Sequence, residues 1–508
     1  MLENYKVKEI SCFPENGLTG RRKIKTTVPE ITKDNIVEVL DRALAEHAVN
    51  AGEIQYLWDV YCGVQDIFDK IKYVRENINN KVVVNRANEI VTFKTAYLLN
   101  EPIQYISNSG EDYVSKRIID LNEMMRSEDK ESKDKEIVDW MHICGLAERF
   151  VITDEMAQIE DGAPYHIHTL DPREAFVIYS AGIGERPMAG VILQYDENDE
   201  LFVNVYTAQS MFTVRRDQPV KEEPHILGGL PLIEYPNNMA RMGAFETVIP
   251  ILNAINQLES DAVDNIQDFV NGFDVFQNCS IDDEKYAELS IGGKAVRVKT
   301  VVPGMEAKVY RIASELSQSG VQSRIDDLTD AYLTICGMPN RNGGSSTSDT
   351  GQAVIFRDGW SEAESRAKDS EKLYTRSERQ FLRIVLNICR KKSEGSFQLD
   401  LKDIGVNFAR KSLNNLQSKF QCFTEGLGNG YIHPQDMYNA FGDIFGDKTA
   451  AYKRGMEWYN SQKQESEKAI QDQLNAERER IASNGGTRNT GTVSTGGSGD
   501  TGTESQDA

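Results

Sequence analysis

The 508-residue sequence contains no apolar run that approaches the roughly 18 to 20 residues needed to span a bilayer. Its first residues, Met-Leu-Glu-Asn-Tyr-Lys, also lack the basic start and the apolar stretch of a signal peptide. We therefore expect a cytosolic protein with no membrane partner. Because 40% of its residues are hydrophobic, the chain can bury the cores of roughly two to four domains.

The sequence also lacks the motifs of common catalytic sites. Its seven cysteines show no C-x-x-C spacing and are interpreted as reduced packing residues. Neither G-x-S-x-G nor H-E-x-x-H occurs. The Gly/Ser-rich stretch from Asn340 to Thr350 has no Lys followed by Ser or Thr, so it cannot form the phosphate site of a P-loop ATPase. We predict a protein that is not an enzyme and that uses no cofactor or metal.

Net positive charge is lacking, since 79 Asp and Glu outnumber 57 Lys and Arg and give a net charge of −22. This balance argues against a protein that wraps nucleic acid with its whole surface, because phosphate binding requires clustered Lys and Arg. A short run from Arg21 to Lys25 is interpreted as an exposed arm. The strand-like segment 275–313 is locally basic, with Arg297, Lys299, Lys308 and Arg311.

Two amphipathic helices flank that segment. In the first, predicted over 244–274, apolar residues recur at three- and four-residue steps and share one face. Asp261, Asp264 and Asp268 fall in a narrow arc nearly opposite, which predicts a solvated acidic side. The second helix, 314–337, places Ile325 and Leu328 on its apolar face and turns Asp326 and Asp330 away, and it ends at Gly337-Met338-Pro339.

An ordered series of short elements resembles a known family. The elements are Tyr61-Cys62-Gly63-Val64-Gln65, an Asn-rich turn at 79–85, Asn100-Glu101-Pro102, Gly145-Leu146-Ala147-Glu148, Asp171-Pro172-Arg173-Glu174, the segment 230–238, and Gly351-Gln352-Ala353-Val354. In this order they resemble the portal (head-to-tail connector) proteins of tailed bacteriophages, in the branch typical of siphophages of Gram-positive hosts. The resemblance extends over about residues 35 to 480, and Thr350 stands where the family has Ser.

The resemblance implies a mostly helical α+β portal fold that assembles into a ring. Its regions here would be an N-terminal wing part at 1–243, stem helices at 244–274 and 314–337, a clip at 275–313, a tunnel loop at 338–350, a long wing helix at 351–395 and a crown at 396–482. We expect a kink in the long helix at Gly359. The tail 483–508 is rich in Gly, Thr and Ser and is predicted to be disordered.

The resemblance also implies a function and partners. A homo-oligomeric ring of twelve subunits would sit at one vertex of the capsid of the virion, and it would be assembled in the host cytoplasm. Double-stranded DNA would pass through its channel without sequence specificity during packaging and ejection. The ring would dock the ATP-driven terminase, the head-tail adaptor and the capsid or scaffold protein.

These implications assign roles to residues. The channel-lining candidates are Asp261, Asp264, Asp268, Asp326 and Asp330, the tunnel-loop residues are Asn340, Arg341 and Asn342, and the basic residues of the clip would dock partners. Ile325 and Leu328 are predicted to pack against a neighbouring subunit, because one subunit offers too little apolar surface to cover both stem helices.

Two alternatives remain open from the residues alone. His166 and His168 share one face of a predicted strand, a spacing that can chelate a metal, so the chain could be a metal-dependent cytosolic enzyme centred on this pair. The other alternative is a different structural component of a virion.

Overall fold

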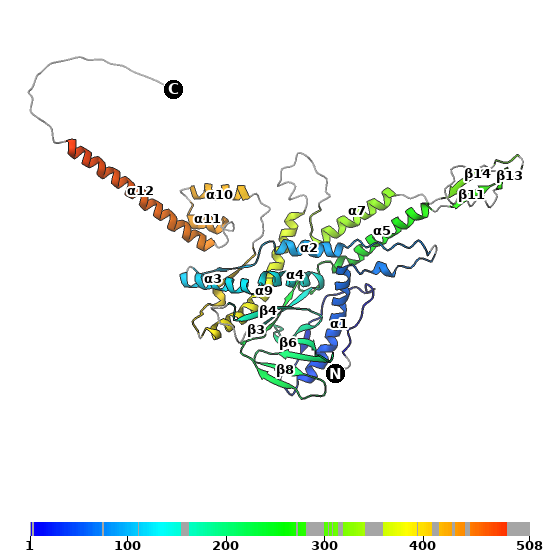
Figure 1. Ribbon diagram of the computed structural model, residues 1–508, viewed down its shortest axis with the longest axis horizontal. Coiled ribbons are helices and arrows are strands. Elements are labelled where there is room, and N and C mark those ends of the chain that lie inside the picture. Colours follow the sequence, from blue (N-terminus) through cyan, green and yellow to red (C-terminus); the bar gives the residue numbers. More distant parts are fainter. Residues whose placement is uncertain are drawn as a thin grey trace, which may run out of the picture. The chain divides into compact units, whose positions relative to one another are not determined.

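The computed structural model divides the chain into two units, Met1–Gln421 and Cys422–Ala508. It describes residues 2, 5–73, 76–109, 111–153, 162–270, 273–280, 299–302, 304–306, 308–312, 318–340, 359–393, 395–408, 416–428, 432–441 and 448–484. Figure 1 shows the first unit as a body of sheets and helices from which one pair of helices extends toward a small strand insert.

A six-stranded sheet forms one part of the first unit. Its strands, in spatial order, are β1 (Ile24–Thr26), β5 (Ala175–Ser180), β6 (Pro187–Tyr195), β7 (Leu201–Tyr206), β8 (Ser210–Val214) and β9 (Lys221–Pro224). β1 pairs with β5 in parallel, and the other neighbours are antiparallel. Helix α1 (Ile36–Cys62) buries Ile36, Leu40 and Leu44 in the same core as apolar residues of this sheet, as its apolar spacing predicts.

A second core surrounds a three-stranded sheet and a long helix. β3 (Leu146–Thr153) lies between β10 (Leu232–Pro236) and β4 (Tyr165–Leu170). Helices α3 (Asp112–Ser127), α4 (Lys130–Cys144) and α9 (Trp360–Lys392) contribute to this core, and β2 (Gln104–Ser107) pairs with β15 (Ile404–Asn407), which follows η5 (Leu401–Asp403). The core therefore joins segments that are about 300 residues apart in the chain.

A third core holds the predicted helix pair. α5 (Ile249–Val270) follows the short turn η4 (Glu246–Val248), and α7 (Gln318–Cys336) contacts α5. Both pack with α1 and with α2 (Arg86–Leu98). Gly337 ends α7 with φ 65°, a left-handed conformation that glycine adopts without strain. The predicted end of this helix is therefore correct.

Two short ladders of antiparallel strands lie in the insert between α5 and α7. β11 (Phe273–Gln277) pairs with β14 (Lys308–Ile312), and β12 (Cys279–Ser280) pairs with β13 (Lys299–Thr300). The first ladder begins three residues after α5. In Figure 1 these strands lie at the far end of the helix pair from α1.

The second unit contains most of the described C-terminal helices. These are α11 (Pro434–Phe441) and α12 (Lys448–Asn484), while α10 (Leu416–Gly428) crosses the boundary between the units. The predicted disordered tail overlaps the end of α12 at residues 483 and 484, and the rest of it lies outside the described residues. Within the described ranges, no helix combines the length and the apolarity that crossing a membrane requires.

Three sequence predictions need correction. Residues 396–408, assigned to the crown, belong to the second core, because β15 pairs with β2 and Phe397 is buried there. Gly359 is not a kink inside a helix, because it has φ 83° and directly precedes the first residue of α9; residues 351–358 lie outside the described part. The basic run is not an exposed arm, since Arg21 is 2% exposed and Ile24 belongs to β1.

Candidate functional site: the polar face of the helix pair

An extended segment covers the polar face of α5. We call residues 64–85 the covering segment; it includes the short turn η2 (Asp66–Asp69). Backbone N–H groups of alternate residues in this segment donate to side chains on successive turns of α5: Asn80 to Asp264 (2.7 Å), Val82 to Ser260 (2.9 Å) and Val84 to Asn256 (2.8 Å). These acceptor side chains occupy the place that a neighbouring strand would take in a sheet.

The two periodicities explain why this arrangement fits. Four residues of an α-helix advance about 6.0 Å, and two residues of an extended chain advance about 6.6 Å. Alternate N–H groups of the covering segment therefore meet every fourth residue of α5. Asn256, Ser260 and Asp264 are all at most 1% exposed, so the segment shields them from water.

Asp264 is the most strongly held member of this row. Besides the Asn80 backbone, it accepts hydrogen bonds from the Asn80 side chain (2.7 Å), Lys70 Nζ (3.0 Å) and Lys72 Nζ (3.3 Å). Burial raises the pKa of the Asp264 carboxyl, but the hydrogen bonds from Asn80 and from the two lysines lower it by more, to about 2. Asp264 is therefore an ionised and fully partnered carboxylate.

The structure corrects the prediction of one solvated acidic stripe. Asp264 is buried, because the covering segment, about 180 residues earlier in the chain, binds that face. The Asp261 side chain is 48% exposed and pairs with Lys70 at 2.8 Å. The side chain of Asp268 lies outside the described residues. These aspartates therefore do not form one uniform exposed row.

The acidic face of α7 is open in the single chain. Asp326 and Asp330 are exposed, and each accepts a hydrogen bond from an uncharged side chain: Gln322 donates to Asp326 (2.9 Å) and Asn340 donates to Asp330 (2.7 Å). Of the predicted tunnel-loop residues, the structure describes Asn340, whereas Arg341 and Asn342 lie outside the described residues.

The predicted ring-packing residues already pack within one chain. Ile325 is only 7% exposed. Leu328 is partly buried against the core to which α1, α2, α5 and α7 contribute. The single chain therefore already shields Ile325 from solvent, and packing of these two residues against a neighbouring subunit stays a prediction.

The basic residues of the insert are only partly described. Lys308 pairs with Glu306 at 3.1 Å, and the register of β11 and β14 places Asp274 opposite Arg311. Lys299 lies in β13, and Arg297 is outside the described residues. An acidic residue therefore lies next to Lys308 and opposite Arg311, which are two of the four predicted docking residues.

The histidine pair does lie on one strand, as its spacing predicts. His166 and His168 are in β4 with ring centroids 6.5 Å apart, and His166 Nδ1 contacts Glu128 Oε1 at 3.1 Å. Among the residues that the structure describes, no group of three or more His, Cys, Asp or Glu is arranged to hold a metal ion. No observation favours a metal enzyme over the alternatives.

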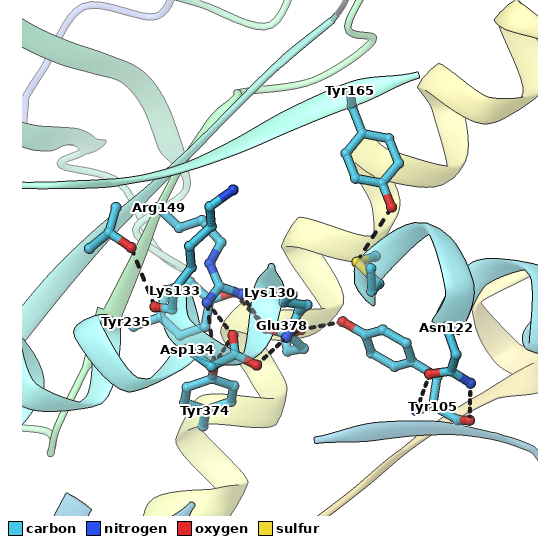
Figure 2. A network of polar contacts seen from close by, with 12 residues as sticks. Tyr105, Asn122, Lys130, Lys133, Asp134, Arg149, Tyr165, Tyr235, Tyr374 and Glu378 are labelled. Atoms are coloured by element: carbon cyan, nitrogen blue, oxygen red, sulfur yellow. Dashed lines mark hydrogen bonds and ion pairs between the residues drawn. The ribbon is translucent and has the colours of Figure 1, made fainter. Parts of the chain in front are cut away.

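A buried ionic network joins the elements of the second core, and its pairing was not predicted. Figure 2 shows Lys130 and Asp134 of α4, Arg149 of β3 and Glu378 of α9 pointing toward one another. Lys130 Nζ lies 2.6 Å from Asp134 and 2.9 Å from Glu378, and Arg149 contacts both carboxylates. Two positive and two negative charges thus balance in a region closed to solvent.

Tyrosine hydroxyls complete this network. Tyr105 and Tyr235 donate to Glu378, and Tyr374 donates to Asp134 (Figure 2). Burial raises the pKa of the Glu378 carboxyl, but Lys130, Arg149 and the hydroxyls of Tyr105 and Tyr235 lower it by more, so that the pKa lies below its ordinary value. The network fixes α4, α9 and three strands to one another with directional bonds, which apolar packing alone does not provide.

Glu148, the neighbour of Arg149 in β3, has a different environment. It is 0% exposed, it lies opposite Glu234 in the register with β10, and neither of its carboxylate oxygens has a hydrogen-bond partner among the described residues. The nearby Arg241 pairs with Glu234 instead. Burial therefore raises the pKa of Glu148 well above its ordinary value, and Arg241 offsets only part of this effect.

The sequence contains one signal for the covered face of α5. Asn256, Ser260 and Asp264 recur at four-residue steps, and the β-branched run Val82-Val83-Val84 has no predicted partner strand. A row of short polar side chains at helical spacing can accept hydrogen bonds from such an extended run. By contrast, the ionic network gives no local signal, because its members are dispersed from Tyr105 to Glu378.

The first unit thus consists of an α+β body that carries a helix pair with a strand insert. Its sequence and its fold were compared with those of known proteins. Residues 40–439 match the family described as "Phage portal protein, SPP1 Gp6-like". This match spans more than half of the chain, so the protein belongs to the SPP1 Gp6-like family of phage portal proteins. No curated protein matches. A solved chain from the neck of an empty GTA particle, computed with C6 symmetry, is similar with 9% identity and a TM-score of 0.39, over 70% of this chain and 89% of that chain.

Proposed function

We propose that this protein forms the ring-shaped channel at one vertex of a phage capsid, through which DNA is packaged and later ejected. The family match over residues 40–439 carries the proposal. In the ring, α5 and α7 form the stem and the strand insert forms the clip. The protein acts as a structural component of the virion, and the terminase supplies the ATP-driven work.

The exposed acids of α7 are the better candidates for the channel wall. The covering segment buries Asp264 and pairs Asp261, which is 48% exposed, with Lys70, whereas Asp326 and Asp330 of α7 are exposed in the single chain. Repeated around a ring, they give a negative lining that repels phosphate and keeps the duplex away from the wall. DNA then slides without adhesion to Lys or Arg, which makes transport independent of sequence.

The insert is proposed to dock the terminase and the head-tail adaptor. Lys299, Lys308 and Arg311 are the described basic residues in it, and complementary charge raises the rate and specificity of such docking. Reversal of Lys308 and Arg311 to Glu is expected to weaken partner binding with a marked dependence on salt. A pull-down in which both partners bind the variant normally contradicts this assignment.

Electron microscopy of the purified protein tests the main proposal. Negative-stain class averages are expected to show closed rings with a central channel, and light scattering gives the number of subunits, for which we expect twelve. A protein that remains a monomer or dimer under all conditions of concentration and salt overturns the proposal.

A packaging assay tests the channel wall. The double variant Asp326→Lys/Asp330→Lys is expected to form rings but to stall packaging, with partial recovery at high salt because phosphate adhesion is screened. Asp261→Lys is the matched control, because Asp261 lies beside the covering segment on α5. Normal packaging by the double variant removes the α7 face from the DNA path.

A further inference from the structure

Residues 68–73 of the covering segment expose apolar side chains to solvent, whereas apolar side chains are usually buried. Ile71 is 71% exposed and Tyr73 is 86% exposed, and Phe68 is exposed as well. The lysines between them turn inward: the Lys70 side chain is 9% exposed and lies between Asp261 and Asp264. Asp69 is exposed and the Lys72 side chain is 27% exposed, so the apolar side chains stand in a mixed surface. Three exposed apolar side chains within six residues are typical of a surface that another protein covers.

This segment is held in place by polar contacts on both sides of the apolar residues. Asp66 accepts hydrogen bonds from the Phe13 backbone (3.1 Å), the Tyr56 hydroxyl (3.0 Å) and Asn253 (2.8 Å). Beyond Tyr73, Asn79 donates to the Lys70 carbonyl at 3.1 Å. The apolar side chains therefore stand on an anchored backbone, so binding through them loses little additional conformational entropy.

A second exposed apolar side chain lies on the opposite side of α5. Ile266 is 47% exposed, and it follows Asp264 by two residues, which places it about 200° away around the helix. The covering segment thus lies on one flank of α5, and Ile266 lies on the other. A ring contact joins two different patches of the same chain, whereas a two-fold dimer joins one patch to itself.

The net charge favours an apolar contact between copies of this chain. Each copy carries −22, so copies repel one another and association must come from apolar burial. Tyr73 is suited to the centre of such a contact, because aromatic side chains supply much of the binding energy at protein interfaces. Lys70 and Lys72 are already paired with aspartates of their own chain and do not need to be desolvated on docking.

We propose that residues 68–73 of one copy dock on the flank of α5 that carries Ile266 in a second copy. This inference rests on the proposed ring, and it assigns the ring contact to a surface other than Ile325 and Leu328. The covering segment therefore has two faces: a polar face that binds α5 of its own chain and an apolar face that binds the neighbouring subunit.

The double variant Ile71→Glu/Tyr73→Glu of the full-length protein tests this contact. It is expected to remain folded by circular dichroism and to stay monomeric by light scattering at concentrations where the wild type forms rings. The control is Ile183→Glu/Tyr195→Glu, which places the same two changes at positions 107% and 57% exposed on the six-stranded sheet and its turn, and it is expected to assemble normally.

The outcomes separate this inference from the proposed function. If the wild type forms no ring, the proposed function fails. If the wild type and Ile71→Glu/Tyr73→Glu both form rings, the proposed function stands and this contact is wrong. The contact is equally wrong if the variant forms rings that no longer bind the terminase or the adaptor.

Ile266→Glu provides the reciprocal test and is expected to block assembly as well. A photo-crosslinking residue at position 73 is expected to join two copies through α5, and adducts elsewhere overturn the assignment.

Discussion

The contact between Asp264 and the covering segment predicts a local loss of stability when its charge is removed. The pKa of Asp264 falls from 3.8 to about 2 in the folded protein. Since one pKa unit corresponds to 1.36 kcal/mol, the ionised carboxylate stabilises the contact by about 2 kcal/mol. Because the folded pKa is the lower one, this contribution is complete above the unfolded pKa near 3.8 and disappears as the pH falls through about 2.

Asp264→Asn preserves the shape of the side chain and removes the charge. At pH 7 we expect the backbone N–H groups of residues 80–84 to exchange with deuterium about 30-fold faster, the factor that corresponds to about 2 kcal/mol of local opening. Peptide-level hydrogen exchange measures this change. Asp261→Asn is the control and is expected to change exchange little, because its side chain is 48% exposed and Lys70 keeps Asp264 as a partner. Unchanged exchange over 80–84 in Asp264→Asn refutes the electrostatic explanation of this contact.

Three further predictions concern the buried groups of the first unit. Glu378→Gln is expected to lower the free energy of unfolding by about 3–5 kcal/mol, because it leaves buried cations unpaired; thermal unfolding measures it, with the exposed Glu362→Gln as a control that stays near wild type. Ile325→Asp places a carboxylate at a position that is 7% exposed and is expected to detach α7, which limited proteolysis detects as new cleavage in 318–336; protection equal to wild type contradicts the assigned packing. The raised pKa of Glu148 means that the folded state holds a proton that the unfolded state releases above about pH 4.3, so stability falls as the pH rises above that value toward the raised pKa. Glu148→Gln is expected to flatten this dependence in denaturant titrations, and an unchanged slope rules out Glu148 as its source.

The helix pair was predictable because its determinants are local. Apolar residues at three- and four-residue steps identify α5 and α7, and a glycine with φ 65° followed closely by Pro339 ends α7. Alternating residues likewise indicate single strands such as β7 (Leu201–Tyr206), although they do not specify which strands pair. Each of these signals lies within one element, so a single sequence contains all of it.

The environment of the individual charges was not predictable in the same way. A helical wheel places Asp264 opposite the apolar face, but its partners Lys70 and Asn80 lie more than 180 residues away in the chain. Arg21 lies in a basic run that the sequence pattern indicates to be exposed, yet it is bound by Glu246, 225 residues later. Polarity alone does not distinguish a solvated charge from a partnered one, because both satisfy the same pattern.

The hydrogen bonds between the covering segment and α5 determine how force passes through the molecule. A small displacement of α5 along its axis breaks the bonds from Asn80, Val82 and Val84 together. The donors meet acceptor side chains again only after a shift of about 6 Å, which is the four-residue spacing between neighbouring acceptors on α5. Intermediate positions are thus unfavourable. The segment continues into Asn85, whose side chain accepts from Asn88 at the start of α2 and donates to the Tyr61 carbonyl near the end of α1. An axial load on α5 is therefore transferred to α1 and α2 through several bonds that share the load, instead of being absorbed by sliding of the helix.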